Sequence, residues 1–140
     1  MPYSIKQIVG LDEEEIKALK ALGLRTTERL LEAAKTPKGR RDLSEKTQID
    51  PKRLLDCANA CDHMRIKGMG KSYVGLLRQV GVSTVRELKY RNPANLAKAM
   101  AEANKANKGD KFVRFLPSEK LIVRWVEHAK KLPLKIVYKD

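Results

Sequence analysis

The sequence contains one segment twice, and the two copies align without a gap 58 positions apart. Each copy has a short apolar stretch, a glycine-containing turn, an amphipathic stretch, a second glycine and then a threonine. The aligned pairs are Ile8 and Ile66, Gly10 and Gly68, Leu19 and Leu77, Gly23 and Gly81, Thr26 and Thr84, and Leu30 and Leu88. Self-similarity at a fixed offset indicates a duplicated supersecondary unit. The repeat therefore predicts two related units, residues 1–62 and residues 63–140.

Both units are predicted to be helical, because apolar residues recur at helical spacing before each glycine stop. Asp50 followed by Pro51 is a strong helix start, and Pro117 is expected to begin the last helix. Other expected features are a break at Thr36-Pro37-Lys38-Gly39, a helix around residues 40–46, a loop or frayed helix end at residues 103–111, and a short strand-like tail at residues 134–138. The predicted fold class is all-α, with two duplicated units packed as one compact domain.

The charge of the chain is strongly positive and unevenly distributed. The formal net charge is +13. Residues 1–60 hold 12 Lys and Arg against 10 Asp and Glu, whereas residues 61–140 hold 18 against 7. A basic half favours a polyanionic partner, most often nucleic acid and less often an anionic membrane surface. Because no apolar run approaches the roughly 18 residues of a membrane span and no signal peptide is evident, we expect a cytoplasmic protein without a membrane partner.

Neither a metal site nor catalytic machinery is expected. Cys57 and Cys61 are four residues apart on a predicted helix, which favours reduced core thiols over a disulfide. With His63 they make three candidate ligands, one fewer than a structural zinc site needs. The acidic run at residues 12–15 suits a helix start. The sequence contains no nucleophile–base pair, phosphate-binding loop or dinucleotide fingerprint, so we expect a non-enzyme without cofactors.

The second hairpin, residues 66–72, has the chemistry of a phosphate site. Glycine at positions 68 and 70 permits close backbone approach, and the start of the following helix presents N–H groups at the positive end of its dipole. Met69 is expected to point inward, while Lys67 and Lys71 add attraction and Ser72 donates a hydrogen bond. Such contacts hold a phosphate but read no sequence. The candidate nucleic-acid-binding residues are Arg65, Lys67, Gly68, Met69, Gly70, Lys71, Ser72, Arg78 and Arg86.

Two resemblances follow from these residues. Ile66-x-Gly68-Met69-Gly70, followed by Leu77, Gly81-Val82, Thr84 and Leu88, resembles the helix-hairpin-helix motif of repair nucleases, Holliday-junction proteins, ligases and recombinases. Nearly the whole chain also resembles the bacterial domain-of-unknown-function 4332 family, through Thr36-Pro37-x-Gly39-Arg40, Ala58-Asn59, Arg65-Ile66-x-Gly68, Gly81-Val82-Ser83-Thr84, Arg91-Asn92-Pro93 and Lys130-Lys131-Leu132-Pro133. The resemblance implies a duplicated helix-hairpin-helix fold and nucleic-acid binding, with DNA favoured over RNA. It implies no catalytic activity.

The first hairpin, Gly10-Leu11-Asp12, departs from the motif. Asp12 occupies the position of the second glycine, and three glutamates follow it. Four carboxylates at a helix start repel phosphate, so a structural role is favoured over binding to a basic protein surface. The second hairpin has a plainer interpretation too, as a tight turn or a protein contact. The alternative function is accordingly a protein-interaction adaptor. This includes self-association between residues 1–60, whose net charge is +2 (12 − 10), and residues 61–140, whose net charge is +11 (18 − 7).

Other basic and aromatic residues leave open questions. Arg114 between Phe112 and Phe115 resembles the combination of aromatic and cationic side chains that stacks on nucleobases. Core packing of both phenylalanines is nevertheless favoured. Trp125 follows the apolar stripe of the last helix and is expected in the core. Arg40-Arg41 either caps a helix or contacts a partner. Further basic residues that extend the predicted footprint are Arg86, Lys89, Arg91, Lys105, Lys108, Lys111 and Arg114.

Overall fold

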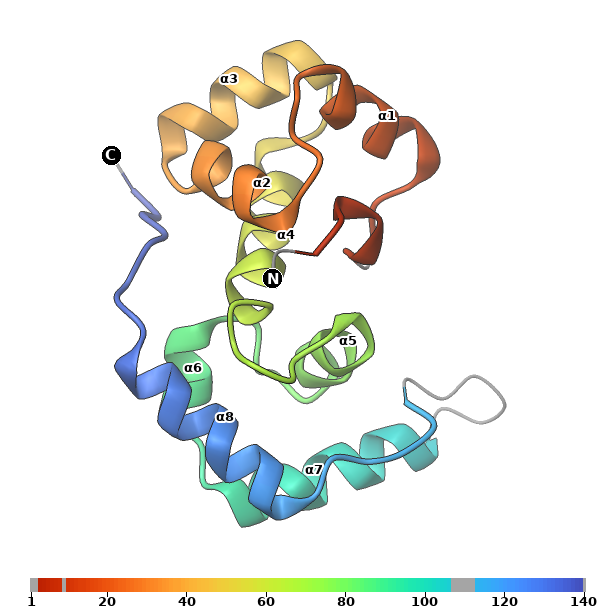
Figure 1. Cartoon of the computed structure of the whole chain (residues 1–140), viewed down its shortest axis with the longest axis vertical. Coiled ribbons are helices and arrows are strands. Elements are labelled where there is room, and N and C mark those ends of the chain that lie inside the picture. Colours follow the sequence, from red (N-terminus) through yellow and green to blue (C-terminus); the bar gives the residue numbers. More distant parts are fainter. Residues whose placement is uncertain (1–2, 9, 107–112, 140) are drawn as a thin grey trace.

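The structure, a computed structural model of the chain, describes residues 3–8, 10–106 and 113–139. Within these residues the protein is helical and contains no strand (Figure 1), so the predicted all-α class is confirmed there. In chain order the elements are a short 3-10 helix, η1 (Ile5–Gln7), followed by α1 (Glu13–Ala21), α2 (Thr27–Ala34), α3 (Pro37–Thr47), α4 (Pro51–His63), α5 (Lys71–Gln79), α6 (Val85–Lys89), α7 (Pro93–Ala106) and α8 (Glu119–Lys131). None of these helices combines the length and the apolar character needed to cross a membrane.

The two copies of the repeat have matching backbone geometry. Gly23 and Gly81 both lie in the left-handed region, with φ of 82° and 88°. The N–H of the following residue then bonds back to the carbonyl of Leu19 in the first copy and Leu77 in the second. Thr26 caps α2 and Thr84 caps α6, each accepting a hydrogen bond from the N–H three residues later. The correspondence thus includes helix ends and caps as well as apolar positions.

The structure corrects two predicted helix boundaries. Thr36 accepts a hydrogen bond from the Gly39 N–H at 3.0 Å and caps α3, and Pro37 is the first helical residue. The expected break is therefore a helix start, as Thr-Pro permits. A Cβ at Gly39 would lie 2.2 Å from the Ala33 carbonyl oxygen, so only glycine fits where α2 meets α3. Pro117 precedes α8, whose cap is Ser118.

The structure also tests the expectations for residues 103–111 and residues 134–138, the first of them in part. Helix α7 continues to Ala106, beyond the point where a loop or frayed end was expected. The rest of that expected loop, residues 107–111, lies outside the described residues. The strand-like tail, residues 134–138, forms no strand.

The helices pack in two groups around a continuous hydrophobic cluster. Helices α1–α4 form the first lobe and α5–α8 form the second, with contacts from α4 to α6 between them (Figure 1). Leu54 in the first lobe and Leu77 and Trp125 in the second are fully buried members of the cluster, which confirms the core position of Trp125. The second hairpin connects α4 to α5 and therefore lies where the two lobes meet.

The chain after α8 returns to the first lobe (Figure 1). The Val137 N–H donates to the Lys35 carbonyl at 2.7 Å, and Tyr138 Oη donates to Asn59 Oδ1 at 2.9 Å. Arg40 is only 4% exposed and donates to the carbonyls of Ala34 and Val137, at 2.8 Å each. Of the two roles considered for Arg40, the structure therefore shows it capping the end of α2 while also binding the C-terminal tail.

Candidate nucleic-acid interface

The second hairpin lies against α8, and Met69 anchors it in the core. Met69 is fully buried, as predicted, and its N–H bonds to the Ile66 carbonyl at 3.1 Å. Gly68 has a φ of 83°, which strains any residue with a Cβ. A Cβ there would lie at an ordinary van der Waals distance of 3.6 Å from the Trp125 indole nitrogen, so the strain comes from the backbone conformation. The turn is therefore tight, and its position over the second lobe is fixed by packing.

The N-terminus of α5 is open. Gly70 is its N-cap residue, with φ of −102° and ψ of −179°, and no described side chain caps the first turn. A Cβ at Gly70 would meet nothing within 4 Å. Lys71 and Ser72 follow, and both side chains are exposed. The first N–H groups of a helix have no intrahelical partner and lie at the positive end of its dipole, so this end can accept an anion.

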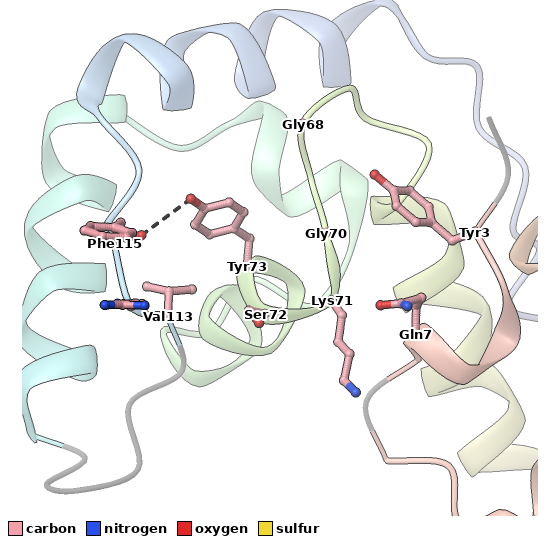
Figure 2. Close-up of a pocket in the computed structure, with 10 residues that line it drawn as sticks. Tyr3, Gln7, Gly68, Gly70, Lys71, Ser72, Tyr73, Val113 and Phe115 are labelled. Carbon is pink, nitrogen blue, oxygen red and sulfur yellow. Dashed lines mark hydrogen bonds between the residues drawn. The ribbon is translucent and has the colours of Figure 1, made fainter.

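A pocket of about 540 Å³, here called the hairpin pocket, lies at this helix start (Figure 2). It includes four of the predicted site residues, which are already neighbours in the sequence: Gly68, Gly70, Lys71 and Ser72. In Figure 2, Tyr3 and Gln7 lie on one side of the hairpin backbone and Phe115 on the other. The remaining lining residues are Tyr3, Gln7, Tyr73, Val113, Arg114 and Phe115.

Phe115 is not a core residue, contrary to the expectation from sequence. Its side chain is 73% exposed at the hairpin pocket, and the Arg114 guanidinium carbon lies 5.5 Å from its ring centroid. Tyr73 Oη donates to the Phe115 carbonyl at 3.4 Å (Figure 2). The expectation failed because no local pattern distinguishes a phenylalanine that packs inward from one that lines a pocket. Phe112, with Lys108 and Lys111, lies outside the described residues.

The other predicted basic residues do not line the hairpin pocket. The Lys67 N–H donates to His128 Nδ1 at 3.3 Å, and Lys67 lines a depression with Gly68 and Arg124 that adjoins the hairpin pocket. Arg65 pairs with Asp62 at 2.5 Å. The structure places the remaining two on the solvent-exposed sides of their helices, Arg78 on α5 and Arg86 on α6.

Two of these arginines line depressions that do not include the hairpin residues. Arg65 lies beside Thr27 and Lys135. Arg78, whose guanidinium is 3.8 Å from the Asp56 carboxylate, lies beside Gly10 and Arg53. The strongest clustering of predicted site residues is therefore at the start of α5.

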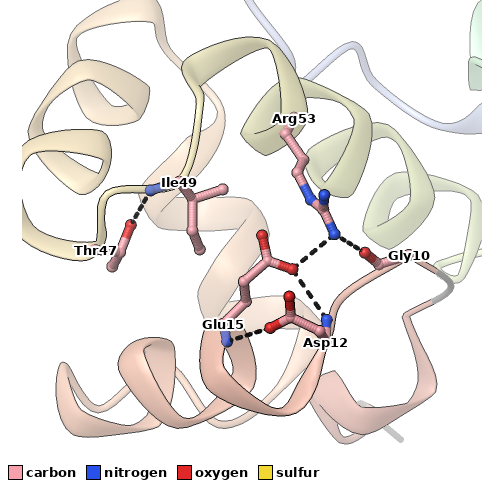
Figure 3. A network of polar contacts seen from close by, with 6 residues as sticks. All are labelled: Gly10, Asp12, Glu15, Thr47, Ile49 and Arg53. Atoms are coloured by element: carbon pink, nitrogen blue, oxygen red, sulfur yellow. Dashed lines mark hydrogen bonds and ion pairs between the residues drawn. The ribbon is translucent and has the colours of Figure 1, made fainter.

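The corresponding helix start in the first lobe is closed (Figure 3). Asp12 Oδ1 accepts from the Glu15 N–H at 2.8 Å, and Glu15 Oε1 accepts from the Asp12 N–H at 2.9 Å. These two bonds form a capping box. Arg53 completes the network by bonding to the Glu15 carboxylate at 2.6 Å and to the Gly10 carbonyl. Side chains thus bond the Asp12 and Glu15 N–H groups at the start of α1, whereas no described side chain caps the start of α5.

Burial controls the titration of several groups away from the hairpin pocket. Burial raises the pKa of the Cys57 thiol to about 11 and raises that of Cys61 further. Both cysteines are unbonded and buried, as the sequence predicted. Burial also raises the pKa of Asp62, although Arg65 opposes this shift. No cluster of potential metal ligands occurs among the described residues.

Some residues of the hairpin pocket were missed in the sequence. Tyr73 was detectable, because it lies in the first turn of α5 beside Lys71 and Ser72. Tyr3 and Gln7 come from the N-terminal segment, which is placed by backbone bonds from Ile5 to Arg25 and from Thr27 to Tyr3. No local signal indicates such a long-range contact.

No curated protein and no solved structure matches this chain. A family model described as "Domain of unknown function (DUF4332)" matches residues 9–132. The match includes all the described α-helices and the second hairpin. It agrees with the resemblance to the domain-of-unknown-function 4332 family inferred from the sequence, and the chain belongs to this family.

Proposed function

We propose that the protein is a small non-catalytic nucleic-acid-binding protein. The second hairpin holds a backbone phosphate, with little preference for base sequence. The observation that carries this proposal is the open N-terminus of α5, where Gly70 provides no side-chain cap and Lys71 and Ser72 are exposed in the hairpin pocket. The closed helix start at Asp12 provides the contrast within the same chain.

The proposed contacts account for both affinity and low selectivity. Backbone N–H groups and the Ser72 hydroxyl donate to phosphate oxygens, and the Lys71 ammonium adds Coulomb attraction. All nucleotides carry the same phosphate, so these contacts fix the position of the strand without reading its bases. The excess of basic residues in the second half of the chain adds a non-specific attraction that depends on salt. The proposal places the protein in the cytoplasm, where reduced thiols and nucleic acid are both present.

The proposal treats residues 1–62 and 63–140 as two helix-hairpin-helix-like units with different roles. The matching glycine conformations and threonine caps at 58-residue spacing support this division. In the first unit the capping box and Arg53 occupy the hairpin, which favours a structural role. In the second unit the same position is free of a side-chain cap.

The test is to give α5 a side-chain cap like the one that Asp12 provides for α1. Gly70→Asp places a carboxylate where Asp12 lies in the first unit, and the φ of −102° and the empty space around Gly70 accommodate it. We expect binding of a labelled 20-mer DNA, measured by fluorescence anisotropy at 50 and 150 mM salt, to weaken about 10- to 100-fold. This range corresponds to the loss of about 1.5–3 kcal/mol from charge-assisted hydrogen bonds.

Two control variants separate the cap from the charge. Lys46→Gln, on the exposed surface of α3, lowers the net charge by one unit, as Gly70→Asp does, and should leave affinity within about twofold at 150 mM salt. Gly70→Asn supplies a neutral cap and should give an intermediate loss. Equal weakening by Gly70→Asp and Lys46→Gln would mean diffuse attraction and would overturn the hairpin site.

Absence of binding by the unmodified protein would favour the other use of this scaffold, a protein-interaction adaptor. That outcome has its own measurement, which is recovery of the same protein partner from lysate before and after nuclease treatment. A partner that is lost with the nucleic acid supports the binding proposal, and one that persists supports the adaptor.

A further inference from the structure

The backbone segment that carries Phe115 is held by hydrogen bonds from Asn104 and Tyr73. Asn104 is 5% exposed, and its side chain makes two hydrogen bonds to the backbone of Val113: Nδ2 donates to the carbonyl at 3.1 Å, and Oδ1 accepts from the N–H at 3.2 Å. Tyr73 then bonds to the Phe115 carbonyl, while its ring packs 5.1 Å from the Trp125 ring. The segment that carries Phe115 is thus anchored at both ends before any ligand binds.

The chemistry of this position suits a flat, electron-rich ligand. An exposed aromatic ring stacks with nucleobases, and a guanidinium beside it adds a cation–π contribution. Phe115 and Arg114 supply this pair, and Phe115 is 73% exposed. Tyr3 and Tyr73 add aromatic surface to the same pocket.

The phosphate donors and the aromatic ring share one pocket. Its volume of about 540 Å³ falls within the roughly 300–1,000 Å³ typical of small-ligand sites. In a nucleotide the phosphate and the base belong to one residue, so a strand held at Lys71 and Ser72 brings its bases to the same pocket. Bases within a duplex are already stacked and paired, whereas an unpaired base is free to stack on protein.

We propose that the hairpin pocket takes an unpaired nucleobase, stacked on Phe115 and Arg114, next to the phosphate held by the start of α5. The protein then prefers strands with unpaired bases to a fully paired duplex. This inference depends on the proposed phosphate site and adds the class of nucleic acid that the site selects. Stacking is available to every base, so the preference concerns strand structure and carries little sequence selectivity.

The test compares a labelled 20-mer of thymidine with a fully paired 20-base-pair duplex, by anisotropy at 150 mM salt. Phe115→Ala is expected to weaken single-strand binding about 5- to 150-fold, the loss of one stacked base, and to leave duplex affinity within twofold. Phe115→Tyr keeps an aromatic ring and should retain single-strand affinity. Because Phe115 is largely exposed, neither substitution removes core contacts.

Tyr90 provides a matched control. It is 74% exposed, and Lys89 lies 5.2 Å from its ring centroid, so it presents a similar aromatic–cation pair elsewhere, on the α6 side of the second lobe. Tyr90→Ala should not change binding to either DNA. A second readout is a single 2-aminopurine in the thymidine strand, whose fluorescence should change on binding to the unmodified protein and not on binding to Phe115→Ala.

The outcomes separate this inference from the proposed function. If Gly70→Asp weakens binding to both DNAs while Phe115→Ala affects neither, the phosphate site stands and the base pocket is wrong. Equal losses on single strand and duplex with Phe115→Ala also overturn the base pocket. If the unmodified protein binds neither DNA, the phosphate site itself fails.

Discussion

His63 is a buried histidine without a good hydrogen-bond partner. It ends α4 and has no exposed surface, and within the described residues neither ring nitrogen makes a well-formed hydrogen bond. Burial lowers the pKa of its imidazole. The Thr84 backbone and Glu87 favour the charged ring, and Arg78 disfavours it, but desolvation is the largest effect. His63 is therefore neutral in the folded protein near neutral pH.

This burial predicts that acid destabilises the fold through His63. Below pH 6.5 the unfolded chain protonates His63 while the folded chain does not, so the free energy of unfolding falls as pH decreases. Between pH 7.5 and 5.5 the loss reaches at most about 1.4 kcal/mol. Urea unfolding of His63→Phe at the same pH values should lack this slope, and His128→Gln should retain it. Asp62, whose raised pKa acts in the opposite direction, is common to all three proteins and cancels in the comparison. A slope that persists in His63→Phe contradicts the prediction.

The starts of α1 and α5 differ in chemistry, although both N-cap residues have an extended backbone. The capping box at Asp12 and the bare Gly70 occupy aligned positions. A capping side chain stabilises a helix and at the same time blocks its N–H groups from any ligand. The first lobe thus gains stability at the position where the second lobe leaves the N–H groups accessible.

The effect of these helix caps on the stability of the protein can be measured with two variants. Asp12→Ala removes the cap of α1 and is expected to lower the free energy of unfolding by about 1 kcal/mol, a fall of roughly 2–5 °C in Tm. Gly70→Asp is expected to raise stability by a few tenths of a kcal/mol, because a capped helix start replaces glycine. Calorimetry of both variants, with Asp42→Ala at an exposed position of α3 as control, checks the signs. If Gly70→Asp destabilises the protein, the start of α5 does not accept a cap as α1 does.

Local signals predicted the elements well and the pocket only in part. Asp50-Pro51, Thr26 and Thr84 lie next to the groups that they cap, so the sequence alone indicates those helix starts. Thr36-Pro37 was misassigned because the same residues end one helix and begin another. The exposure of Phe115 and the proximity of Tyr3 to the second hairpin depend on contacts between distant segments, which periodicity does not encode.

At the scale of the whole molecule, the C-terminal tail joins the two lobes. The tail leaves α8 in the second lobe and bonds to Lys35, Arg40 and Asn59 in the first. Lys135 also lies 3.7 Å from Glu32. Because Arg40 is buried, its bond to the Val137 carbonyl satisfies a charged group that water does not reach well. The tail is therefore expected to couple the stability of the two lobes.

A chain ending at Pro133 tests this coupling. Loss of the tail leaves Arg40 and the buried Asn59 with fewer partners, and we expect a loss of roughly 2–4 kcal/mol in the free energy of unfolding. Trp125 reports the second lobe by fluorescence, and circular dichroism reports all helices. The two urea transitions should coincide in the full chain and separate in the shortened one, because contacts between α4 and α6 then carry more of the coupling. Coincident, unshifted transitions in the shortened chain would show that the lobes are coupled without the tail.

Tyr138→Phe, which removes only the hydroxyl bonded to Asn59, should lower the free energy of unfolding by about 1 kcal/mol, whereas Tyr90→Phe should not.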